Sequence, residues 1–355
     1  MVLIGIDAHM RSHTAVVVDA GTGRKLGELT VSADEFGHAK LRAFAGRFGD
    51  EREWAIEDCR NLSRRLERAL LEGGERVVRV PPKLMAGQRK SERTFGKSDG
   101  IDALAVARAA LREPDLPVAR LEGPEREIAI LVNYRHSLVV ERTRMQGRVR
   151  WLLFELDPAL NPPGRSLNLL STLERLRRRL NRQPPSVLLR VVREQLARIR
   201  ELTVQINTIE RELRPLVRRH ASALLALPGV GTINAARLLA EVADVRRFKT
   251  EAQLALYAGV APLDASSGRQ RRHRLNRSGN RHLNAALHMI ALTQVRIHPP
   301  ARDYVARRRA EGKTGKEAVR ALKRHLIRTI YRLLRLCADR EPIEIEGSSV
   351  APCIT

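Results

Sequence analysis

Three short apolar runs near the start of the chain constrain its fold most strongly. They span residues 2–8, 13–19 and 26–31, and the turn Gly21-Thr22-Gly23 separates the second run from the third. Runs of this length with tight connections predict three antiparallel strands. Two further apolar runs, at 54–57 and 77–80, alternate with helical patterns at 35–48, 62–71 and 101–111. The expected order of elements is therefore βββαβαβα.

That order is typical of a ribonuclease H-like domain, in which helices cover the faces of a mixed sheet. From Pro124 onward the pattern changes to long helices, which we expect at 126–155, 167–180 and 187–217. The last of these carries apolar residues at spacings of three and four, which predicts a coiled coil or a helical hairpin. The fold class is therefore α/β followed by all-α.

The stretch Leu227-Pro228-Gly229-Val230-Gly231 precedes another helical pattern and is typical of a helix-hairpin-helix element. Glycines in such a turn let backbone N–H groups approach a phosphate, although a Gly-rich turn before a helix is also common as plain structure. We expect four regions in all: a catalytic domain over 1–120, a helical coiled-coil or dimerisation region over 121–220, a mostly helical domain over 221–340, and a tail over 341–355.

The charge of the chain limits its partners. Its 355 residues include 65 Lys and Arg against 40 Asp and Glu, a formal net charge of +25, and most of the cations are arginines. Arginine is suited to bidentate contact with phosphate, so nucleic acid is the expected partner. The three cysteines lie far apart and match neither a disulfide framework nor a zinc cluster. No apolar run reaches membrane-spanning length and no signal peptide is evident, so we expect a cytoplasmic, nucleoid-associated prokaryotic protein without a membrane partner.

Two acids at the start of a predicted helix are candidate metal ligands. Asp99 and Asp102 lie three residues apart, which places both carboxylates on one helical face. Acids in a first helical turn also act as N-terminal caps, so the pair alone does not decide between capping and metal binding.

Two further acids, Asp7 and Glu57, end predicted strands. In a ribonuclease H-like fold, these positions and the helical pair converge at one end of the central sheet. Four carboxylates so close together repel one another unless they hold cations, which favours a site for two Mg²⁺ ions, with Mn²⁺ as the alternative. His9 follows Asp7 by two residues, and the sequence leaves open whether it contacts this site or is structural.

A serine pair is the second candidate for chemistry. Ser266-Ser267-Gly268 precedes an arginine-rich segment over 269–281 that contains no acid. A serine hydroxyl is a weak nucleophile unless it is activated, and no His-Asp pair beside it fits an acyl-transfer triad. Basic residues around a serine suit attack on phosphorus, because they stabilise the charge that develops there. From spacing alone, a plain loop is the commoner explanation.

An ordered set of motifs resembles the DEDD transposases of the insertion sequence one-ten family. The resemblance runs from about residue 2 to about residue 335. The motifs are Gly5-Ile6-Asp7-Ala8-His9, Ala55-Ile56-Glu57-Asp58-Cys59-Arg60, Val80-Pro81-Pro82, the stretch from Gly96 to Ala105, Leu227-Pro228-Gly229-Val230-Gly231, Gly259-Val260-Ala261-Pro262, Ser266-Ser267-Gly268 and Gly279-Asn280-Arg281. Each motif alone is weak, but the order of the set is specific.

The resemblance implies a RuvC-like N-terminal domain, a coiled-coil region and a C-terminal transposase domain. In such an enzyme Asp7, Glu57, Asp99 and Asp102 bind Mg²⁺, and a serine of the C-terminal domain forms a covalent phosphoserine link to DNA. Ser267, directly before Gly268, matches that serine best, with Ser266 as the alternative.

The resemblance also implies partners. They are double-stranded donor and target DNA, a structured non-coding guide RNA called the bridge RNA, and further copies of the chain in a homodimer or tetramer that completes the active site between subunits.

Two other functions fit the same residues. A Holliday-junction-type nuclease uses the same acids to activate water and leaves no protein attached to DNA. A non-catalytic nucleic-acid-binding protein uses only the basic surface, but it has no need for four converging carboxylates.

Overall fold

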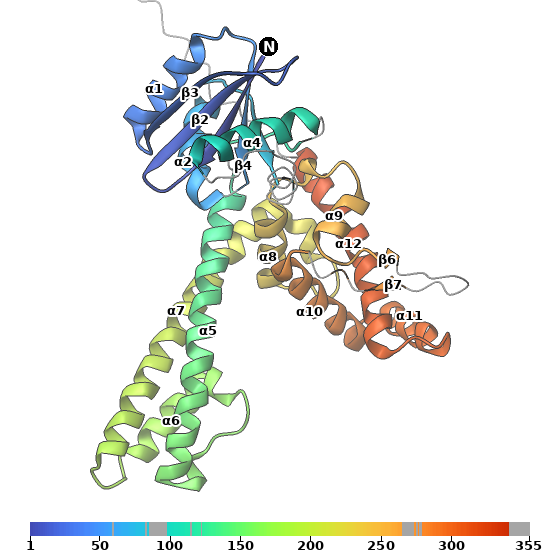
Figure 1. Cartoon of the computed structure of the whole chain (residues 1–355). Coiled ribbons are helices and arrows are strands. Elements are labelled where there is room, and N and C mark those ends of the chain that lie inside the picture. Colours follow the sequence, from blue (N-terminus) through green and yellow to red (C-terminus); the bar gives the residue numbers. More distant parts are fainter. Residues whose placement is uncertain are drawn as a thin grey trace, which may run out of the picture. The chain divides into compact units, whose positions relative to one another are not determined.

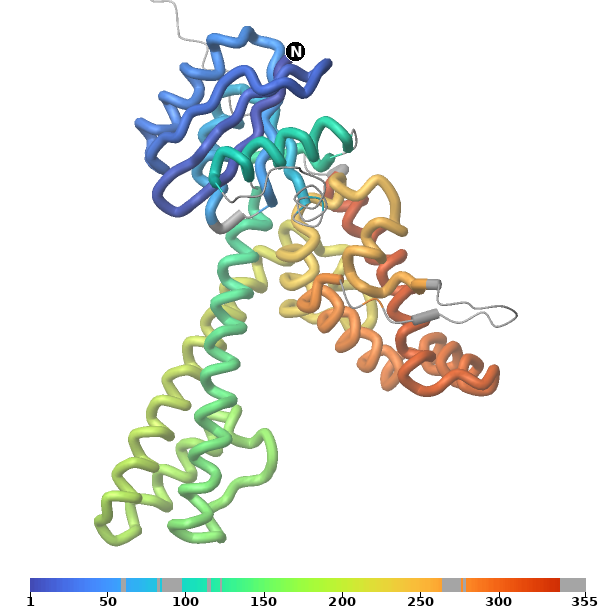
Figure 2. Tube along the Cα trace, viewed as in Figure 1, coloured from blue at the N-terminus to red at the C-terminus, as the bar shows by residue number. Residues whose placement is uncertain are grey.

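The chain consists of two compact units, Met1–Glu122 and Gly123–Thr355, which can be followed by colour in Figures 1 and 2. The computed structural model describes residues 1–58, 60–81, 84, 98–113, 116–121, 123–264, 273–274, 276 and 279–340.

The first unit is built on one five-stranded sheet. Its strands are β1 (Val2–Ala8), β2 (Ser12–Asp19), β3 (Lys25–Ser32), β4 (Arg52–Glu57) and β5 (Val77–Val80). Their order across the sheet is β3-β2-β1-β4-β5. The first three strands are antiparallel neighbours, whereas β4 runs parallel to both β1 and β5. This mixed topology confirms the ribonuclease H-like fold predicted from the order of elements.

Helices cover both faces of the sheet (Figure 1). Helices α1 (Glu35–Gly46) and α2 (Arg60–Glu72) lie on one face, and α4 (Asp99–Arg112) lies on the other. Side chains of β1 alternate between the two cores: Ile6 belongs to the core of Leu41 and Leu66, whereas Leu3 packs with the alanines of α4. Because alternate residues of a strand face the same side, Asp7 shares the α4 face with Leu3.

Gly5 lets α4 pack directly on β1. A Cβ atom at Gly5 would lie 2.2 Å from the carbonyl oxygen of Ala103 and 2.6 Å from the backbone nitrogen of Ala107. Both separations are far inside van der Waals contact, so this approach requires glycine. The contact holds α4 on β1 within about one helical turn of Asp99 and Asp102.

The second unit begins with a helical arm. Helices α5 (Glu125–Leu156) and α7 (Val187–Leu225) lie side by side, with α6 (Leu170–Leu180) packed against α7 (Figures 1 and 2). Two short 3-10 turns, η1 (Pro158–Leu160) and η2 (Ser166–Asn168), connect α5 to α6. The predicted apolar seam of α7 is buried except at its last residue, Leu216, which is only partly buried. The other seam residues are at most 5% exposed: Val192, Leu196, Ile199, Leu202, Ile206, Ile209 and Leu213.

Two of the predicted helix bounds need correction. The helix expected over 187–217 continues past Pro215 to a kink at the non-helical residue Ala221, and a short second helix beyond the kink ends at Leu225. The helix expected to begin at Leu167 begins at Leu170, because Leu169 is extended and the residues before it form the separate turn η2.

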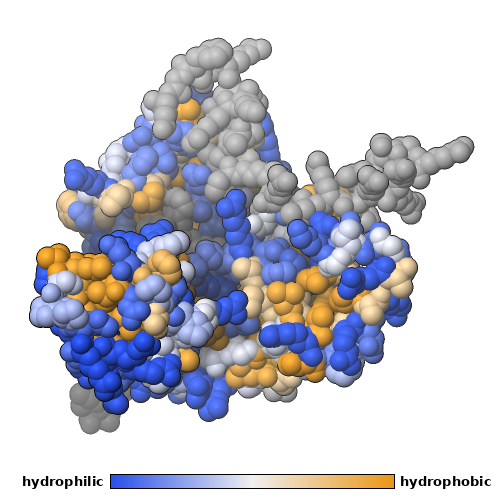
Figure 3. All heavy atoms as spheres, turned by 90° about the horizontal axis from the view of Figure 1, so that it is seen from below, coloured by the Kyte–Doolittle hydropathy of each residue, from blue (hydrophilic) through white to orange (hydrophobic). Residues whose placement is uncertain are grey.

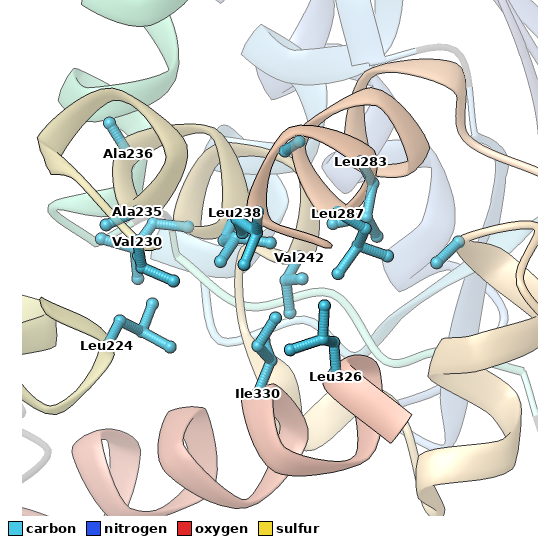
Figure 4. Close-up of a cluster of buried hydrophobic side chains, with 14 of the residues drawn as sticks. Leu224, Val230, Ala235, Ala236, Leu238, Val242, Leu283, Leu287, Leu326 and Ile330 are labelled. Carbon is cyan, nitrogen blue, oxygen red and sulfur yellow. The ribbon is translucent and has the colours of Figure 1, made fainter. Parts of the chain in front are cut away.

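The remaining helices share one core with the second half of α7, which α8 and α12 contact directly. They are α8 (Thr232–Val242), the short turn η3 (Val245–Arg247), α9 (Glu251–Tyr257), α10 (Arg281–Ile297), α11 (Pro299–Ala310) and α12 (Gly315–Arg340), with the two-residue strands β6 (Leu263–Asp264) and β7 (His273–Arg274). Figure 4 shows Leu224 of α7, Leu238 of α8, Leu287 of α10 and Ile330 of α12 in their shared core. Because this core joins α7 to the later helices, the regions expected over 121–220 and 221–340 lie in one compact unit.

The turn between α7 and α8 has the expected helix-hairpin-helix character, since two packed helices meet there across the stretch from Ala226 to Gly231. Hydrophilic residues cover much of the face seen in Figure 3, with apolar patches between them. Among the helices that the structure describes, none combines the length and the apolar character needed to span a membrane.

Candidate metal centre

The ends of two neighbouring strands bring Asp7 and Glu57 to the same edge of the sheet. β1 and β4 are parallel with Ile6 opposite Ile56, so Asp7 and Glu57 occupy the next positions on their strands. Glu57 is the last residue of β4 and is partly buried, whereas Asp7 is only 8% exposed. The register of the sheet therefore places two of the four predicted acids next to each other along the backbone.

The first turn of α4 carries the other two acids. Ser98 caps this helix, since its Oγ accepts a hydrogen bond from the backbone nitrogen of Ile101 at 3.3 Å. The cap position is thus filled by serine and not by Asp99 or Asp102. Asp102 is also buried, at 8% exposed, which a capping role does not require. Asp99 and Asp102 lie in the first turn of α4, where acids also favour the helix dipole, so their position fits both helix stabilisation and metal binding.

Asp7, His9 and Asp99 form a group of candidate ligands. His9 Nε2 lies 3.0 Å from Asp7 Oδ2 and 3.5 Å from Asp99 Oδ1. One ligand atom from each residue lies within 4.8 Å of the other two. Within the described parts of the chain, this group does not extend to Glu57 or Asp102. The role of His9 was left open by the sequence, because its contact with Asp99 depends on how α4 packs on β1.

Burial and neighbouring charge make Asp7 costly to ionise. Burial raises the pKa of the Asp7 carboxyl above its ordinary value, and the carboxylates of Asp102 and Asp99 raise it further. The charge of His9 and its hydrogen bond to Asp7 lower that pKa and offset part of the rise. A divalent cation would oppose both burial and repulsion, because a nearby positive charge favours the ionised carboxyl. The donor set, carboxylate oxygens with one imidazole nitrogen, therefore fits a divalent metal.

Ser266, Ser267 and Gly268 lie outside the described residues, as does most of the arginine-rich segment after them. The two strands that flank them are described. β6 and β7 pair antiparallel, with Leu263 opposite Arg274. In the sequence, both serines therefore belong to the connection between two paired strands.

A glycine pair and a polar network hold together the segments that precede β6 and follow β7. Gly259 has a φ of +67°, and a Cβ atom at Gly279 would lie 2.3 Å from the Cα of Gly259. Asn284 Nδ2 donates hydrogen bonds to the carbonyl oxygens of Ala258 at 2.8 Å and Gly259 at 3.2 Å. Lys323, only 6% exposed, donates to Asn284 Oδ1 at 2.8 Å. Because an ammonium group only donates, Lys323 fixes the orientation of this amide.

Gly259 and Gly279 belong to motifs identified in the sequence, but Lys323 was not predicted as part of this network. A lysine in a basic helix gives no signal, since only the packing of α12 against α10 brings Lys323 to Asn284.

A second feature suits a phosphate. An open pocket at the N-terminus of α8 is lined by Glu210, Arg214 and residues 231–234. The N-cap residue, Gly231, has no side chain with which to cap the first N–H groups of α8. Free N–H groups at a helix N-terminus are well placed to bind phosphate oxygens. This geometry supports contact with a nucleic-acid backbone.

Two family profiles match the chain. Residues 4–158 match the DEDD profile of IS110, described as a transposase, and residues 221–306 match the profile described as the transposase IS116/IS110/IS902 family. Together they cover the sheet unit, part of the arm and most of the helices that follow.

Individual proteins are similar over most of their length. The 44.8 kDa uncharacterized protein of insertion element IS116 from Streptomyces clavuligerus is 29% identical, with 94% of each chain covered. The 43.6 kDa protein of insertion element IS110 from Streptomyces coelicolor is 30% identical over 67% of this chain and 71% of its own. The pilin gene-inverting protein of Moraxella bovis is 26% identical over 73% of both chains.

Proposed function

Because this chain belongs to the IS110 family of transposases, we propose that it cuts and rejoins DNA through a metal centre in its first unit and a serine nucleophile in its second. The observation that carries the proposal is the group of Asp7, His9 and Asp99 at the end of the central strands. A transposase binds DNA, and the net charge of +25 supplies the cations for contact with the phosphate backbone.

Two Mg²⁺ ions are the proposed cofactors, with Mn²⁺ as the alternative, and Asp7, Glu57, Asp99 and Asp102 are their proposed ligands. Bound there, the ions would polarise a phosphodiester for in-line displacement. The chain itself positions the ligands. The register of β1 and β4 places Asp7 and Glu57, and the packing of α4 places Asp99 and Asp102. The raised pKa of Asp7 supports this assignment, because such a carboxyl gains most from a cation.

Ser267 is the proposed nucleophile, and Ser266 is the alternative. A bond forms between the serine Oγ and phosphorus, one ester P–O bond of the DNA breaks, and the displaced deoxyribose oxygen leaves as a hydroxyl. Arginines within 269–281 would stabilise the charge on the phosphoryl group. The pilin gene-inverting relative supports rejoining as well as cutting, because inversion of a gene requires that cut strands be joined again.

The proposal includes a structured guide RNA, donor and target DNA, and a homodimer or tetramer. Pairing with the RNA would carry sequence recognition, as in other guided effectors. We assign metal chemistry to residues 1–120, self-association to 121–220 and strand attack to 221–340. Trp151 and Phe154 support self-association, since they are 76% and 50% exposed on α5 and large exposed apolar side chains mark interaction surfaces.

A recombination assay tests the proposal. The full-length protein is incubated with Mg²⁺, the donor and target DNA of its element, and RNA transcribed from the non-coding flank of that element. We expect recombinant DNA and a covalent protein–DNA adduct, both lost in Ser267→Ala and in Asp102→Ala. The matched control, Ser266→Ala, retains both products.

Three results would overturn parts of the proposal. Normal recombination by Ser267→Ala contradicts the serine assignment, and recombination without RNA contradicts the guide. Cut DNA with free 5′-phosphates and no attached protein indicates a hydrolytic nuclease of the Holliday-junction type. Absence of any Mg²⁺-dependent cleavage indicates a non-catalytic binding protein.

A further inference from the structure

Two carboxylates from different elements converge on one nitrogen of His9. Nε2 lies 3.0 Å from an oxygen of Asp7, on β1, and 3.5 Å from an oxygen of Asp99, on α4. An imidazole nitrogen carries at most one hydrogen, so it donates well to only one of two acceptors. A cation shared by all three side chains accounts for this convergence better than a single hydrogen bond does.

The spacing of the three ligand atoms matches a six-coordinate ion. With metal–ligand bonds of about 2.1 Å, adjacent ligand atoms of an octahedral ion lie about 3.0 Å apart and opposite ones about 4.2 Å apart. The two His9 contacts, 3.0 and 3.5 Å, have the spacing of adjacent ligands. The ligand atoms of Asp7 and Asp99 lie within 4.8 Å of each other, a range that includes both adjacent and opposite positions around the ion.

The backbone holds His9 in place while its ring keeps freedom to adjust. The N–H of His9 donates to the carbonyl oxygen of Ser12 at 2.9 Å, which closes the connection between β1 and β2. The side chain is 48% exposed, so the ring can adjust its orientation without disturbing a packed core. His9 follows Asp7 by two residues, so the end of β1 positions both side chains.

We propose that His9 is a nitrogen ligand of the metal centre, bound through Nε2 beside the carboxylates of Asp7 and Asp99. This inference rests on the proposed metal centre and adds a residue to it. It also predicts a preference among ions: an imidazole ligand favours Mn²⁺ over Mg²⁺, because nitrogen donors raise affinity for transition metals more than for Mg²⁺.

Mn²⁺ binding to the full-length protein tests the inference without reference to activity. Pulsed electron paramagnetic resonance detects a directly bound ¹⁴N through its modulation of the Mn²⁺ spin echo. We expect this modulation in the wild type and its loss in His9→Asn, whose polar side chain is too short to reach the position of Nε2. We further expect Mn²⁺ affinity to fall about tenfold in the variant and the ratio of Mn²⁺ to Mg²⁺ affinity to shrink. The control His136→Asn, on α5, keeps both the modulation and the affinity.

The other outcomes distinguish an error in the His9 assignment from an error in the metal centre itself. Mn²⁺ bound by the wild type without ¹⁴N modulation, or modulation that survives in His9→Asn, overturns His9 as a ligand while the carboxylate site stands. No Mn²⁺ binding by the wild type overturns the metal centre itself. A circular dichroism melt shows whether His9→Asn is folded. If it is not, His9→Gln replaces it in the same measurement, and retention of the modulation there overturns the inference.

Discussion

Folding favours a neutral carboxyl at Asp7, whereas the proposed metal centre requires an ionised one. The Asp7 carboxyl lies at the end of a buried strand, and burial and the nearby acids raise its pKa. A carboxyl whose pKa is higher in the folded than in the unfolded state binds more protons when folded. The free energy of unfolding of the metal-free protein therefore decreases as pH rises through the interval between the two pKa values.

Replacing this charge should stabilise the metal-free protein. We expect Asp7→Asn to raise the melting temperature at pH 7 in chelator, because the variant has no carboxylate to bury, and to flatten the pH dependence described above. Mg²⁺ or Mn²⁺ at one hundred times the dissociation constant should stabilise the wild type by about 2.7 kcal/mol and so raise its melting temperature, but should not raise that of the variant. Asp303→Asn, an exposed change on α11, is the control. A lower metal-free melting temperature for Asp7→Asn would contradict this account of Asp7.

At the scale of elements, the packing of α4 on β1 assembles the site. Gly5 permits this packing, since any side chain there would meet the backbone of α4 at Ala103 and Ala107. The same contact brings the first turn of α4, with Asp99, to the strand end that carries Asp7 and His9.

A methyl group at Gly5 should therefore separate the helix from the strand. We expect Gly5→Ala to lower the free energy of unfolding by about 3 kcal/mol, as overpacking does, and to weaken Mn²⁺ binding, because it moves Asp99 away from Asp7. Gly46→Ala is the matched control, because a Cβ at Gly46 meets nothing within 4 Å and alanine favours the helix. Urea denaturation measures both variants, and equal stability of Gly5→Ala and the wild type would refute the close-packing argument.

The elements themselves were largely predictable. Apolar runs of strand length, separated by glycine turns, predicted the order βββαβαβα, and the structure confirms it, because burial on both faces makes such runs distinctive. The end of α7 was not predictable, since Pro215 is a breaking signal that the helix passes, whereas the kink at Ala221 falls on a residue type that favours helix. The site was predicted only in part: strand ends indicate where acids gather, but the contact of His9 with Asp99 arises from tertiary packing.

At the scale of the whole molecule, charge determines how the protein meets nucleic acid. A net charge of +25 carried mainly by arginine predicts binding that weakens steeply with salt, because each phosphate contact releases counterions. The pocket at the N-terminus of α8, beside Arg214, is one place where such a contact is expected.

We expect the affinity for DNA, plotted as log K against log salt, to have a steep negative slope. Arg214→Gln should reduce the magnitude of that slope by about 0.9, equally for cognate and unrelated sequences, because a phosphate contact carries no sequence information. Arg177→Gln is the control, since that guanidinium already pairs with Glu174 at 2.8 Å. Fluorescence anisotropy over a salt series provides the measurement, and a slope near zero for the wild type would rule out binding through the basic surface.

The most direct test of the central proposal, strand attack by a serine supported by the metal centre, is to map the covalent link between protein and DNA. Trypsin cleaves after Lys249 and Arg269, which places both serines in the peptide over 250–269. After a cleavage reaction with Mg²⁺ and nuclease digestion, mass spectrometry should find this peptide with a nucleotide phosphate on Ser267, and should find none when Asp7→Asn replaces the wild type. Cut DNA together with an unmodified peptide would contradict the account, whereas a phosphate on Ser266 would overturn only the choice of Ser267 as the nucleophile.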